Sequence, residues 1–328
     1  MPHRHRNLIG RIADIGNLRD AYQKTARNKR KTWGFLEFKE YAERNLATLR
    51  EEIMGGSYRQ GEYRVFTIHE PKARVISALD FKDRVVQHAL CNVIEPIFDA
   101  AMLPYSFACR HGRGTHSAVK HVQSRLRSTG LGYYLKTDFS KYFPSINRAR
   151  LHEIIRRRIG CSGTLGLIGA MIPSVGRGLP IGCLTSQLFA NVYGTEFDRL
   201  IHFTMGHRHW ARYMDDIVIL GDSPEVLARS FGKIRDFAMD SMGLGISKWH
   251  TAPVSRGINF VGYRIWSGHK LIRKDSVTRA KRKISAYVGN GDLQSLGSFM
   301  AAWSGHVQWA DTHNLKTWME DKYGITCG

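Results

Sequence analysis

Cysteine is scarce in this 328-residue chain, which contains five, and no two of them form a CxxC pair. An odd number of widely spaced cysteines predicts neither a disulfide framework nor a structural zinc site. Reduced thiols are the simplest interpretation, and they are typical of a cytoplasmic protein. The five are Cys91, Cys109, Cys161, Cys183 and Cys327.

Long hydrophobic runs are also missing. No apolar stretch approaches the roughly 18 residues that a membrane-spanning helix needs. The N-terminal residues 1–11 are basic but lack the apolar segment of a secretory signal. The sequence therefore predicts no association with the membrane interior and no secretion.

Acidic residues are few compared with basic ones. Lys and Arg number 49 against 28 Asp and Glu, which gives a formal net charge of +21. Repulsion among so many positive charges opposes compaction of the chain, so a polyanionic partner is expected. Nucleic acid is the first candidate, because Lys and Arg side chains that contact phosphates release counterions. A membrane surface is the second.

The basic residues gather toward both ends of the chain. Each cluster could be a solvated face, but two clusters in one strongly basic chain favour a path for nucleic acid. The predicted nucleic-acid contacts are Arg27, Lys29, Arg30 and Lys31 near the N-terminus, and Lys281, Arg282 and Lys283 near the C-terminus.

The remaining composition, with 43% hydrophobic and 23% charged residues, is that of a globular protein of two or three packed subdomains. Strand and helix patterns alternate without a regular βαβ repeat, which predicts an α+β fold. Helices are expected at 7–54 (apolar at Leu36, Tyr41, Leu46, Leu49 and Ile53, ending at Gly55), 83–98 and 186–203, and from 270 onward. Strands are expected at 64–68, 74–79, 133–138 and 259–266, with a turn at 70–72 and a hairpin at 212–220.

Two adjacent carboxylates, Asp215 and Asp216, are predicted at the turn of that last hairpin, between apolar segments. Paired acids in apolar surroundings are costly unless a cation binds there. An exposed turn is the alternative, since Asp is common in turns. Hairpin turns usually carry Asn-Gly or Asp-Gly rather than Asp-Asp, so the pattern favours a metal site.

A third acid, Asp138, ends the predicted strand 133–138. Capping of the following helix is its alternative role. Together the three acids match the needs of phosphoryl transfer, in which carboxylates hold two Mg²⁺ ions roughly 4 Å apart. One ion activates an attacking hydroxyl and the other stabilises the leaving group. Asp138 and Asp215 are the expected bridging ligands, with Asp216 nearby.

Five segments in a fixed order resemble the motifs of reverse transcriptases, over about Phe66 to Trp266. Asp138 and Asp215 are separated by 77 residues, a workable spacing for motifs A and C. The segments are 70–74 with 83–87 (fingers), 138–143 (motif A), 178–193 (motif B), 213–216 (motif C) and 243–248 (motif D), followed by 259–263, which is similar to the primer-grip strand.

The resemblance implies a right-hand polymerase: a basic helical segment (1–62), fingers (63–132), palm (133–266) and a short helical thumb (267–328). It also implies roles for single residues. Lys72 and Arg74 contact the incoming dNTP, although they could be solvated turn residues. Phe143 is the steric gate against ribonucleotides, unless it is a core aromatic. The carbonyl of Phe139 joins the ligands of Mg²⁺, for which Mn²⁺ is an alternative, and Lys248 donates a proton to pyrophosphate.

Motif B departs from the usual pattern. Most reverse transcriptases carry Gln where this chain has Ile181, and Ser-Pro where it has Ser186 and Gln187. This combination resembles the enzymes of diversity-generating retroelements, from bacteria or phages. The resemblance implies error-prone copying at the adenines of a template-repeat RNA, an RNA–cDNA hybrid product, and a small, basic, oligomeric accessory protein in the cytoplasm of a bacterial or phage-infected cell.

The physical reading of Ile181 is compatible with low fidelity, since an amide can hydrogen-bond near the nascent base pair and Ile cannot. Ile181 could instead pack beneath the sheet. Three alternatives stay open: a conventional compact reverse transcriptase of retron or group II intron type, a catalytically silent nucleic-acid-binding module, and a membrane-surface protein. The first would usually keep the Gln, and the second would not need all three acids.

Overall fold

The computed structural model describes residues 4–69 and 73–323. The chain forms two compact units, each built from discontinuous segments. The first unit comprises Met1–Pro104, Phe139–Thr204 and Lys233–Ser247. The second comprises Tyr105–Asp138, Met205–Gly232 and Lys248–Gly328. The predicted four-part division into N-terminal segment, fingers, palm and thumb remains a prediction.

The first unit opens with four helices, α1 (Ile9–Ile12), α2 (Ile15–Ala26), α3 (Trp33–Glu40) and α4 (Ala42–Met54). Asp14 caps α2 by accepting a hydrogen bond from the Asn17 N–H at 3.0 Å. The helical prediction for this region and its end at Gly55 are confirmed. Of the apolar positions that indicated this region, Leu46, Leu49 and Ile53 are buried, whereas Leu36 and Tyr41 are 50% and 56% exposed.

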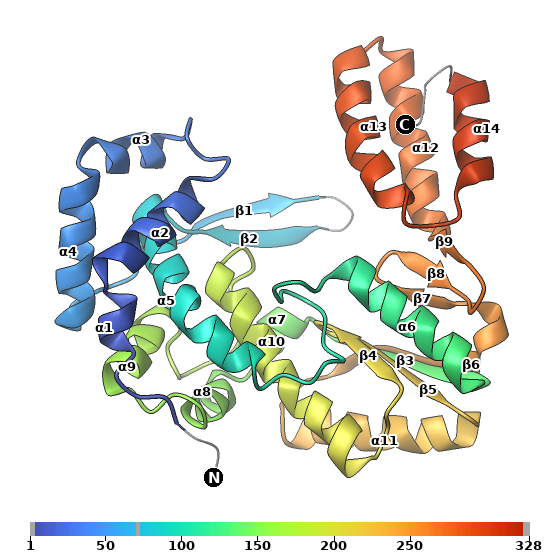
Figure 1. The fold of residues 1–328 in the computed structure, drawn as a ribbon, viewed down its shortest axis with the longest axis horizontal. Coiled ribbons are helices and arrows are strands. Elements are labelled where there is room, and N and C mark those ends of the chain that lie inside the picture. Colours follow the sequence, from blue (N-terminus) through green and yellow to red (C-terminus); the bar gives the residue numbers. More distant parts are fainter. Residues whose placement is uncertain (1–3, 70–72, 324–328) are drawn as a thin grey trace. The chain divides into compact units, whose positions relative to one another are not determined.

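Helix α5 (Phe81–Asp99) is the buried centre of the first unit and lies alongside α2 (Figure 1). It confirms the predicted helix at 83–98. Its apolar face is fully covered, with Val86, Leu90 and Ile94 all inaccessible to solvent. Packing of this kind stabilises a helix far more than intrinsic propensity does.

A two-stranded ribbon, β1 (Arg64–Ile68) and β2 (Arg74–Ala78), precedes α5. The strands are antiparallel, with Phe66 opposite Ile76. Every residue of β1 is exposed. The turn predicted at 70–72 lies outside the described residues.

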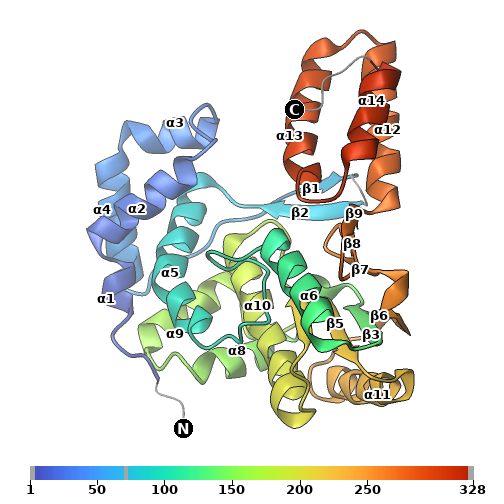
Figure 2. The same cartoon turned by 45° about the vertical axis from the view of Figure 1, so that its right-hand side comes forward.

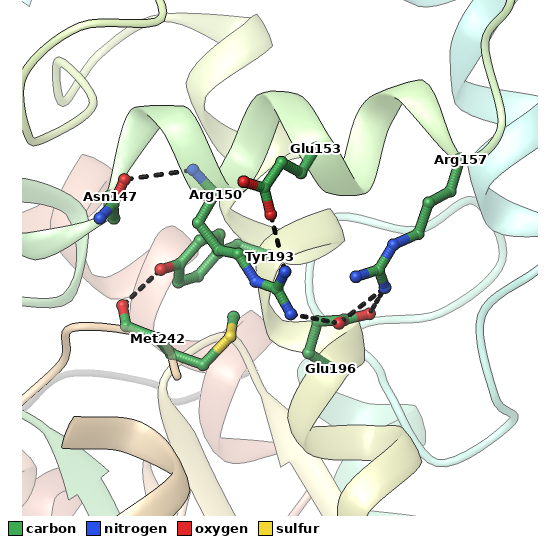
Figure 3. A network of polar contacts seen from close by, with 7 residues as sticks. All are labelled: Asn147, Arg150, Glu153, Arg157, Tyr193, Glu196 and Met242. Carbon is green, nitrogen blue, oxygen red and sulfur yellow. Dashed lines mark hydrogen bonds and ion pairs between the residues drawn. The ribbon is translucent and has the colours of Figure 1, made fainter. Parts of the chain in front are cut away.

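The segment Phe139–Thr204 of the first unit is mainly helical. Its helices are α7 (Tyr142–Ser145), α8 (Arg148–Arg156), α9 (Ser162–Met171) and α10 (Leu184–Arg199), which continues as a π-helical turn, Leu200–Thr204. The helix predicted at 186–203 is therefore confirmed. Figure 3 shows how α8 is fixed to α10: Arg150 and Arg157 both bind the Glu196 carboxylate, the latter at 2.8 Å. The Tyr193 hydroxyl donates to the Met242 carbonyl.

The second unit contains a four-stranded sheet in the order β4-β5-β3-β6. Its strands are β3 (Tyr133–Phe139), β4 (Trp210–Tyr213), β5 (Asp216–Gly221) and β6 (Ile246–Pro253). Helix α6 (Thr115–Thr129), which sequence patterns did not predict, covers one face of the sheet (Figures 1 and 2). Helix α11 (Pro224–Asp240), also not predicted, follows β5.

Three short antiparallel strands follow: β7 (Ile258–Phe260), β8 (Tyr263–Ile265) and β9 (Lys270–Ile272). The prediction of one strand at 259–266 is wrong, because the chain reverses at Val261 and Gly262. Their φ angles of 42° and 94° are both positive, as a two-residue hairpin loop of type I′ requires. The helical region expected from residue 270 begins only after β9.

The C-terminal helices α12 (Lys274–Gly289), α13 (Leu293–Val307) and α14 (His313–Tyr323) run side by side (Figure 2). They bury a shared core that includes Ile284, Trp303 and Met319. Among the residues that the structure describes, no helix is both long and apolar enough to traverse a lipid bilayer. The predicted α+β class is confirmed by the mixture of helices and antiparallel sheets.

Candidate active site

Two residues, Met214 and Asp215, form the tight loop that joins β4 to β5. The flanking residues Tyr213 and Asp216 are paired across the hairpin. Met214 has a φ of 57°, in the left-handed region that side chains rarely adopt. Asp216 is the first residue of β5 rather than part of the turn, which corrects the prediction that both acids occupy the turn. Backbone strain such as the positive φ of Met214 is common at functional sites.

The third predicted acid lies directly across the sheet. Asp138 on β3 is the register partner of Asp216 on β5. Burial, together with the negative charges of Asp138 and Asp216, raises the pKa of Asp215 to about 6. The structure therefore brings the three predicted acids together in the second unit, in surroundings that disfavour their accumulated negative charge.

Lys136 offsets part of that charge. Its Nζ donates to Oδ2 of Asp216 at 2.7 Å and to the carbonyl of Asn259 at 2.6 Å. Burial raises the pKa of Asp216, and Lys136 opposes that shift. The second oxygen, Oδ1, is buried and has no hydrogen-bond partner within the described ranges. A buried acceptor of this kind is costly unless a donor or a cation meets it.

The acids fit a cation, although not as a preformed cage of three. Within residues 4–69 and 73–323, no three Asp, Glu, His or Cys side chains are arranged to hold a metal ion. Asp138 and Asp215 form a close pair of carboxylates, while Asp216 is turned to Lys136. Oxygen donors of this kind suit Mg²⁺, which needs only one or two carboxylates beside water and phosphate oxygens. The carboxylates of Asp138 and Asp215, together with the Oδ1 atom of Asp216, could hold the ion.

Arg212, on β4, supports the loop and was missed in the sequence analysis. Its side chain is fully buried. The guanidinium donates to the Met214 carbonyl and to Oγ of Ser106, each at 3.0 Å. Burial of an Arg side chain is destabilising unless its N–H groups find acceptors. The bond to the Met214 carbonyl therefore fixes the loop that carries Asp215. The only sequence signal was a charge within an otherwise apolar strand.

Phe143 belongs to the first unit. Its neighbour Tyr142 is the core aromatic, since it is buried, stacks on Phe139 at 5.6 Å, and donates its hydroxyl to the Ala190 carbonyl. Phe143 is half-buried and meets Tyr142 edge-on at 6.0 Å. Phe143 thus lies outside the buried core, which disfavours its alternative role as a core aromatic beside Tyr142, and the steric gate remains a prediction. The Phe139 carbonyl follows Asp138 directly in the chain.

The motif B segment is held against the β1–β2 ribbon. Gly182 has a φ of 115°, and a Cβ there would lie 3.0 Å from the Ser77 carbonyl oxygen, so glycine is needed. The Ser77 N–H donates to the Ile181 carbonyl at 2.8 Å. Ile181 is half-buried and lies outside the buried core, while Ser186 is buried and Gln187 exposed. Ile181 therefore does not behave as a core residue.

The other predicted contacts are spread over both units. Arg74 is exposed on β2, opposite Ile68. Lys72 lies outside the described residues. Lys248 is exposed on β6, the neighbour of β3 in the sheet. Their contacts with nucleotide or pyrophosphate remain predictions.

The two basic clusters differ in their surroundings. Arg27, Lys29, Arg30 and Lys31 are exposed in and around the link between α2 and α3. In the C-terminal cluster only Arg282 is exposed. Lys281 lies 3.4 Å from the centre of the Trp318 ring, and Lys283 lies 5.8 Å from that of Phe299. These two lysines therefore help to join α12 to its neighbours, besides any contact with phosphate.

Comparison with known proteins connects this geometry to a family. Residues 68–265 match the family described as reverse transcriptase (RNA-dependent DNA polymerase). Among curated proteins, the chain is 27% identical over 172 residues to Protein YkfC of Escherichia coli, covering 48% of this chain and 45% of that protein. It is 23% identical over 197 residues to the group II intron-encoded protein LtrA of Lactococcus lactis, covering 55% and 33%. The chain thus spans less than half the length of these relatives.

The fold is also found in a solved structure, apo telomerase from Candida tropicalis truncated from its C-terminal domain. The TM-score is 0.50 with 12% sequence identity, and the match covers 71% of this chain and 60% of that one. At this level of identity the likeness concerns the fold alone. Together with the family match, it confirms the predicted right-hand polymerase fold.

Proposed function

This chain belongs to the reverse transcriptase family, and on that premise we propose that it copies an RNA template into DNA by adding dNTPs to the 3′ hydroxyl of a primer. Its partners are then a template RNA, the growing RNA–cDNA hybrid and dNTPs. Two Mg²⁺ ions, or Mn²⁺ in their place, are the proposed cofactors, and the cytoplasm is the proposed location.

The close pair of Asp138 and Asp215 is the single observation that carries this proposal. The pKa of Asp215 is raised to about 6 by burial and by Asp138, so the pair is under electrostatic strain that a divalent cation would relieve. When bound, the ions lower the pKa of the primer hydroxyl and neutralise charge on the triphosphate. Asp138 and Asp215 would hold them, with the Phe139 carbonyl and Oδ1 of Asp216 as further donors.

Other residues of the chain would orient the substrates. We assign Phe143 to the space under the sugar ring, where its bulk rejects a 2′ hydroxyl. Arg74, with Lys72, would bind the triphosphate, and Lys248 would protonate the departing pyrophosphate. The exposed residues Arg27, Lys29, Arg30, Lys31 and Arg282 would contact phosphates of the nucleic acid.

A primer-extension assay tests this function. The purified chain is given an RNA template, a DNA primer, the four dNTPs and Mg²⁺, and labelled products are resolved by length. The proposal expects template-length DNA that disappears when the metal is chelated. A folded preparation that binds the primer–template but makes no DNA with either Mg²⁺ or Mn²⁺ would leave the silent nucleic-acid-binding module as the better account.

Reverse transcriptases of two kinds, the conventional compact type and the type found in diversity-generating retroelements, fit the family. The curated relatives favour the conventional compact type. LtrA is a group II intron-encoded protein, and an intron protein of Saccharomyces cerevisiae is 25% identical over 166 residues. On this reading the chain copies its RNA with ordinary fidelity. This is the alternative of the sequence analysis, and the comparisons support it better than the retroelement type.

A second candidate is the enzyme of a diversity-generating retroelement, which is favoured by Ile181 in motif B. Its half-buried side chain, outside the core, leaves room for a role beside the base pair. On this reading the enzyme misreads adenines of a template-repeat RNA. It would act with a small, basic, oligomeric accessory protein, a partner implied by the resemblance in motif B.

Sequencing of cDNA made on one RNA template separates the two candidates. The retroelement type expects errors concentrated opposite template adenines, reduced in Ile181→Gln because the amide restores a hydrogen bond of about 0.5–1.5 kcal/mol. That energy corresponds to a severalfold to tenfold change in discrimination. Uniformly accurate cDNA, or equal adenine error rates in both enzymes, supports the conventional type.

A further inference from the structure

Lys136 lies on the same face of β3 as Asp138, because residues two apart on a strand point to the same side. Asp216 is the cross-strand partner of Asp138 and therefore the diagonal neighbour of Lys136. The ammonium reaches Oδ2 of Asp216 at 2.7 Å, and both side chains are largely shielded from solvent. This is a charge-assisted contact inside the cluster of acids.

The same ammonium has a second partner. It donates to the carbonyl of Asn259 on β7 at 2.6 Å and lies 5.7 Å from the centre of the Phe260 ring. Strand β7 is half of the β7–β8 hairpin, whose loop is Val261 and Gly262. One side chain therefore joins the strand that carries Asp216 to the hairpin whose sequence is similar to a primer grip.

We propose that Lys136 is the positioning residue of the metal centre: it anchors Asp216 through Oδ2, presents Oδ1 to a divalent cation, and holds the β7–β8 hairpin in register with the catalytic loop. This inference rests on the proposed function. It concerns how the carboxylate is oriented rather than which residues react.

The two carboxylate oxygens of Asp216 differ in their contacts, which supports a positioning role for Lys136. An ion pair that served stability alone would engage or solvate both oxygens, since a buried unpaired acceptor is costly. Here Oδ2 is bonded and Oδ1 is buried without a hydrogen-bond partner in the described part of the chain. The geometry leaves Oδ1 available for a ligand that the chain itself does not supply.

The neighbouring charges are consistent with this assignment. Asp138 lies opposite Asp216 and forms a close pair with Asp215, so the cluster holds three carboxylates against Lys136 and the more distant Arg273. The repulsion left over favours a further cation. Residues that orient metal ligands typically control metal affinity by about 10–100-fold.

Mn²⁺ binding, measured by electron paramagnetic resonance of the free ion, tests the inference without relying on activity. The full chain is loaded with an RNA template, a dideoxy-terminated DNA primer and the matching dNTP, so that no chemistry follows. The variants are Lys136→Met, Lys136→Arg, and Asp138→Asn as the defective centre. Lys233→Met, on the exposed side of α11, is the matched control.

We expect Lys136→Met to weaken Mn²⁺ binding by about 10–100-fold, and Lys136→Arg, which keeps the charge and the donors, to recover most of it. Lys233→Met should match the wild type. Unchanged or tighter binding in Lys136→Met would overturn the inference, and so would an equal loss in both Lys136 variants. Should Lys136→Met not fold, Lys136→Gln takes its place with the same expectation.

The outcome also separates this inference from the proposed function. If the wild type binds Mn²⁺ no better than Asp138→Asn, the metal centre itself is absent and the proposed function fails. If wild type and Asp138→Asn differ while Lys136→Met equals the wild type, only the role of Lys136 fails.

Discussion

The loop that carries Asp215 is fixed by one buried guanidinium, and removing it should affect both stability and catalysis. Arg212 donates to the Met214 carbonyl and to Oγ of Ser106, each at 3.0 Å. Arg212→Met keeps a long side chain of similar reach but deletes every donor. The carbonyl and the hydroxyl then lose a partner in a site closed to water.

The size of the effect follows from those two contacts. Hydrogen bonds to a charged group contribute about 1.5–3 kcal/mol each, and some of the loss is recovered because Met is apolar. We therefore expect the free energy of unfolding to fall by about 3 kcal/mol. A loop displaced by about 1 Å would lower the rate of DNA synthesis by roughly 100-fold.

Urea unfolding followed by circular dichroism measures the first quantity, and primer extension at saturating dNTP measures the second. Arg212→Lys, which keeps the charge but not the forked donor geometry, should fall between the wild type and Arg212→Met. Arg279→Met on the exposed face of α12 is the control and should change stability by less than about 0.5 kcal/mol.

Two results would refute this reasoning. One is an Arg212→Met variant that unfolds at the same urea concentration as the wild type. The other is a destabilised variant that, while still folded, synthesises DNA at the wild-type rate. In the second case Arg212 would support the core but not the catalytic loop.

Three further predictions concern the substrate, the nucleic acid and pH. Phe143→Ala should raise the ratio of rNTP to dNTP incorporation on one template, and an unchanged ratio in an active enzyme would remove Phe143 from the sugar site. Neutralising Arg282 should remove about one phosphate contact with RNA, which would reduce the slope of log K against log salt concentration by roughly 0.7 for single strands. Lys281 and Lys283 are less suitable for this test because they also pack on aromatic rings. Burial lowers the pKa of His121 from 6.5 to about 4. As the pH falls, the unfolded chain therefore takes up the proton before the folded chain does. The free energy of unfolding should fall by up to about 2 kcal/mol between pH 6.5 and pH 4, after allowance for partial exposure of the ring. His121→Gln should flatten that dependence in urea titrations, and an unaltered pH profile would contradict it.

Much of the β4–β5 hairpin could be predicted from sequence, because its signals are local. Alternation of apolar residues on both sides of Tyr213 to Asp216 marks two strands, and two acids between them mark a site. The exact loop could not be predicted, since nothing in the local pattern distinguishes Met214 and Asp215 from Asp215 and Asp216 as the loop pair. The register of β4 and β5 decides it.

Other errors have tertiary causes. Asn259 to Trp266 has the composition of one strand, yet the chain reverses at Val261, a residue that strongly disfavours positive φ. Exposed Leu36 and Tyr41 follow a helical spacing but have no neighbouring element to cover them among the described residues. Periodicity identifies an apolar face without telling whether anything packs against it.

Lys136 and Arg212 were missed for different reasons. Lys136 could have been found, because a charge two residues before a strand-ending Asp shares its face. Arg212 could not, since its partners are a backbone carbonyl and Ser106, a residue 106 positions away in the chain. Only the folded arrangement shows that a basic residue within an apolar strand is satisfied rather than exposed.

The central claim is that Asp138 and Asp215 form the metal centre of an RNA-directed DNA polymerase. Single-turnover extension of a DNA primer on an RNA template tests it most directly, with Asp138→Asn, Asp215→Asn, the double change Asp215→Ala/Asp216→Ala and, as control, Asp222→Asn. Asp222 is exposed and follows β5. We expect the control to extend the primer at the wild-type rate, and the three altered centres to give no product while remaining folded and bound to the primer–template. Substantial extension by folded Asp138→Asn or Asp215→Asn would contradict the account.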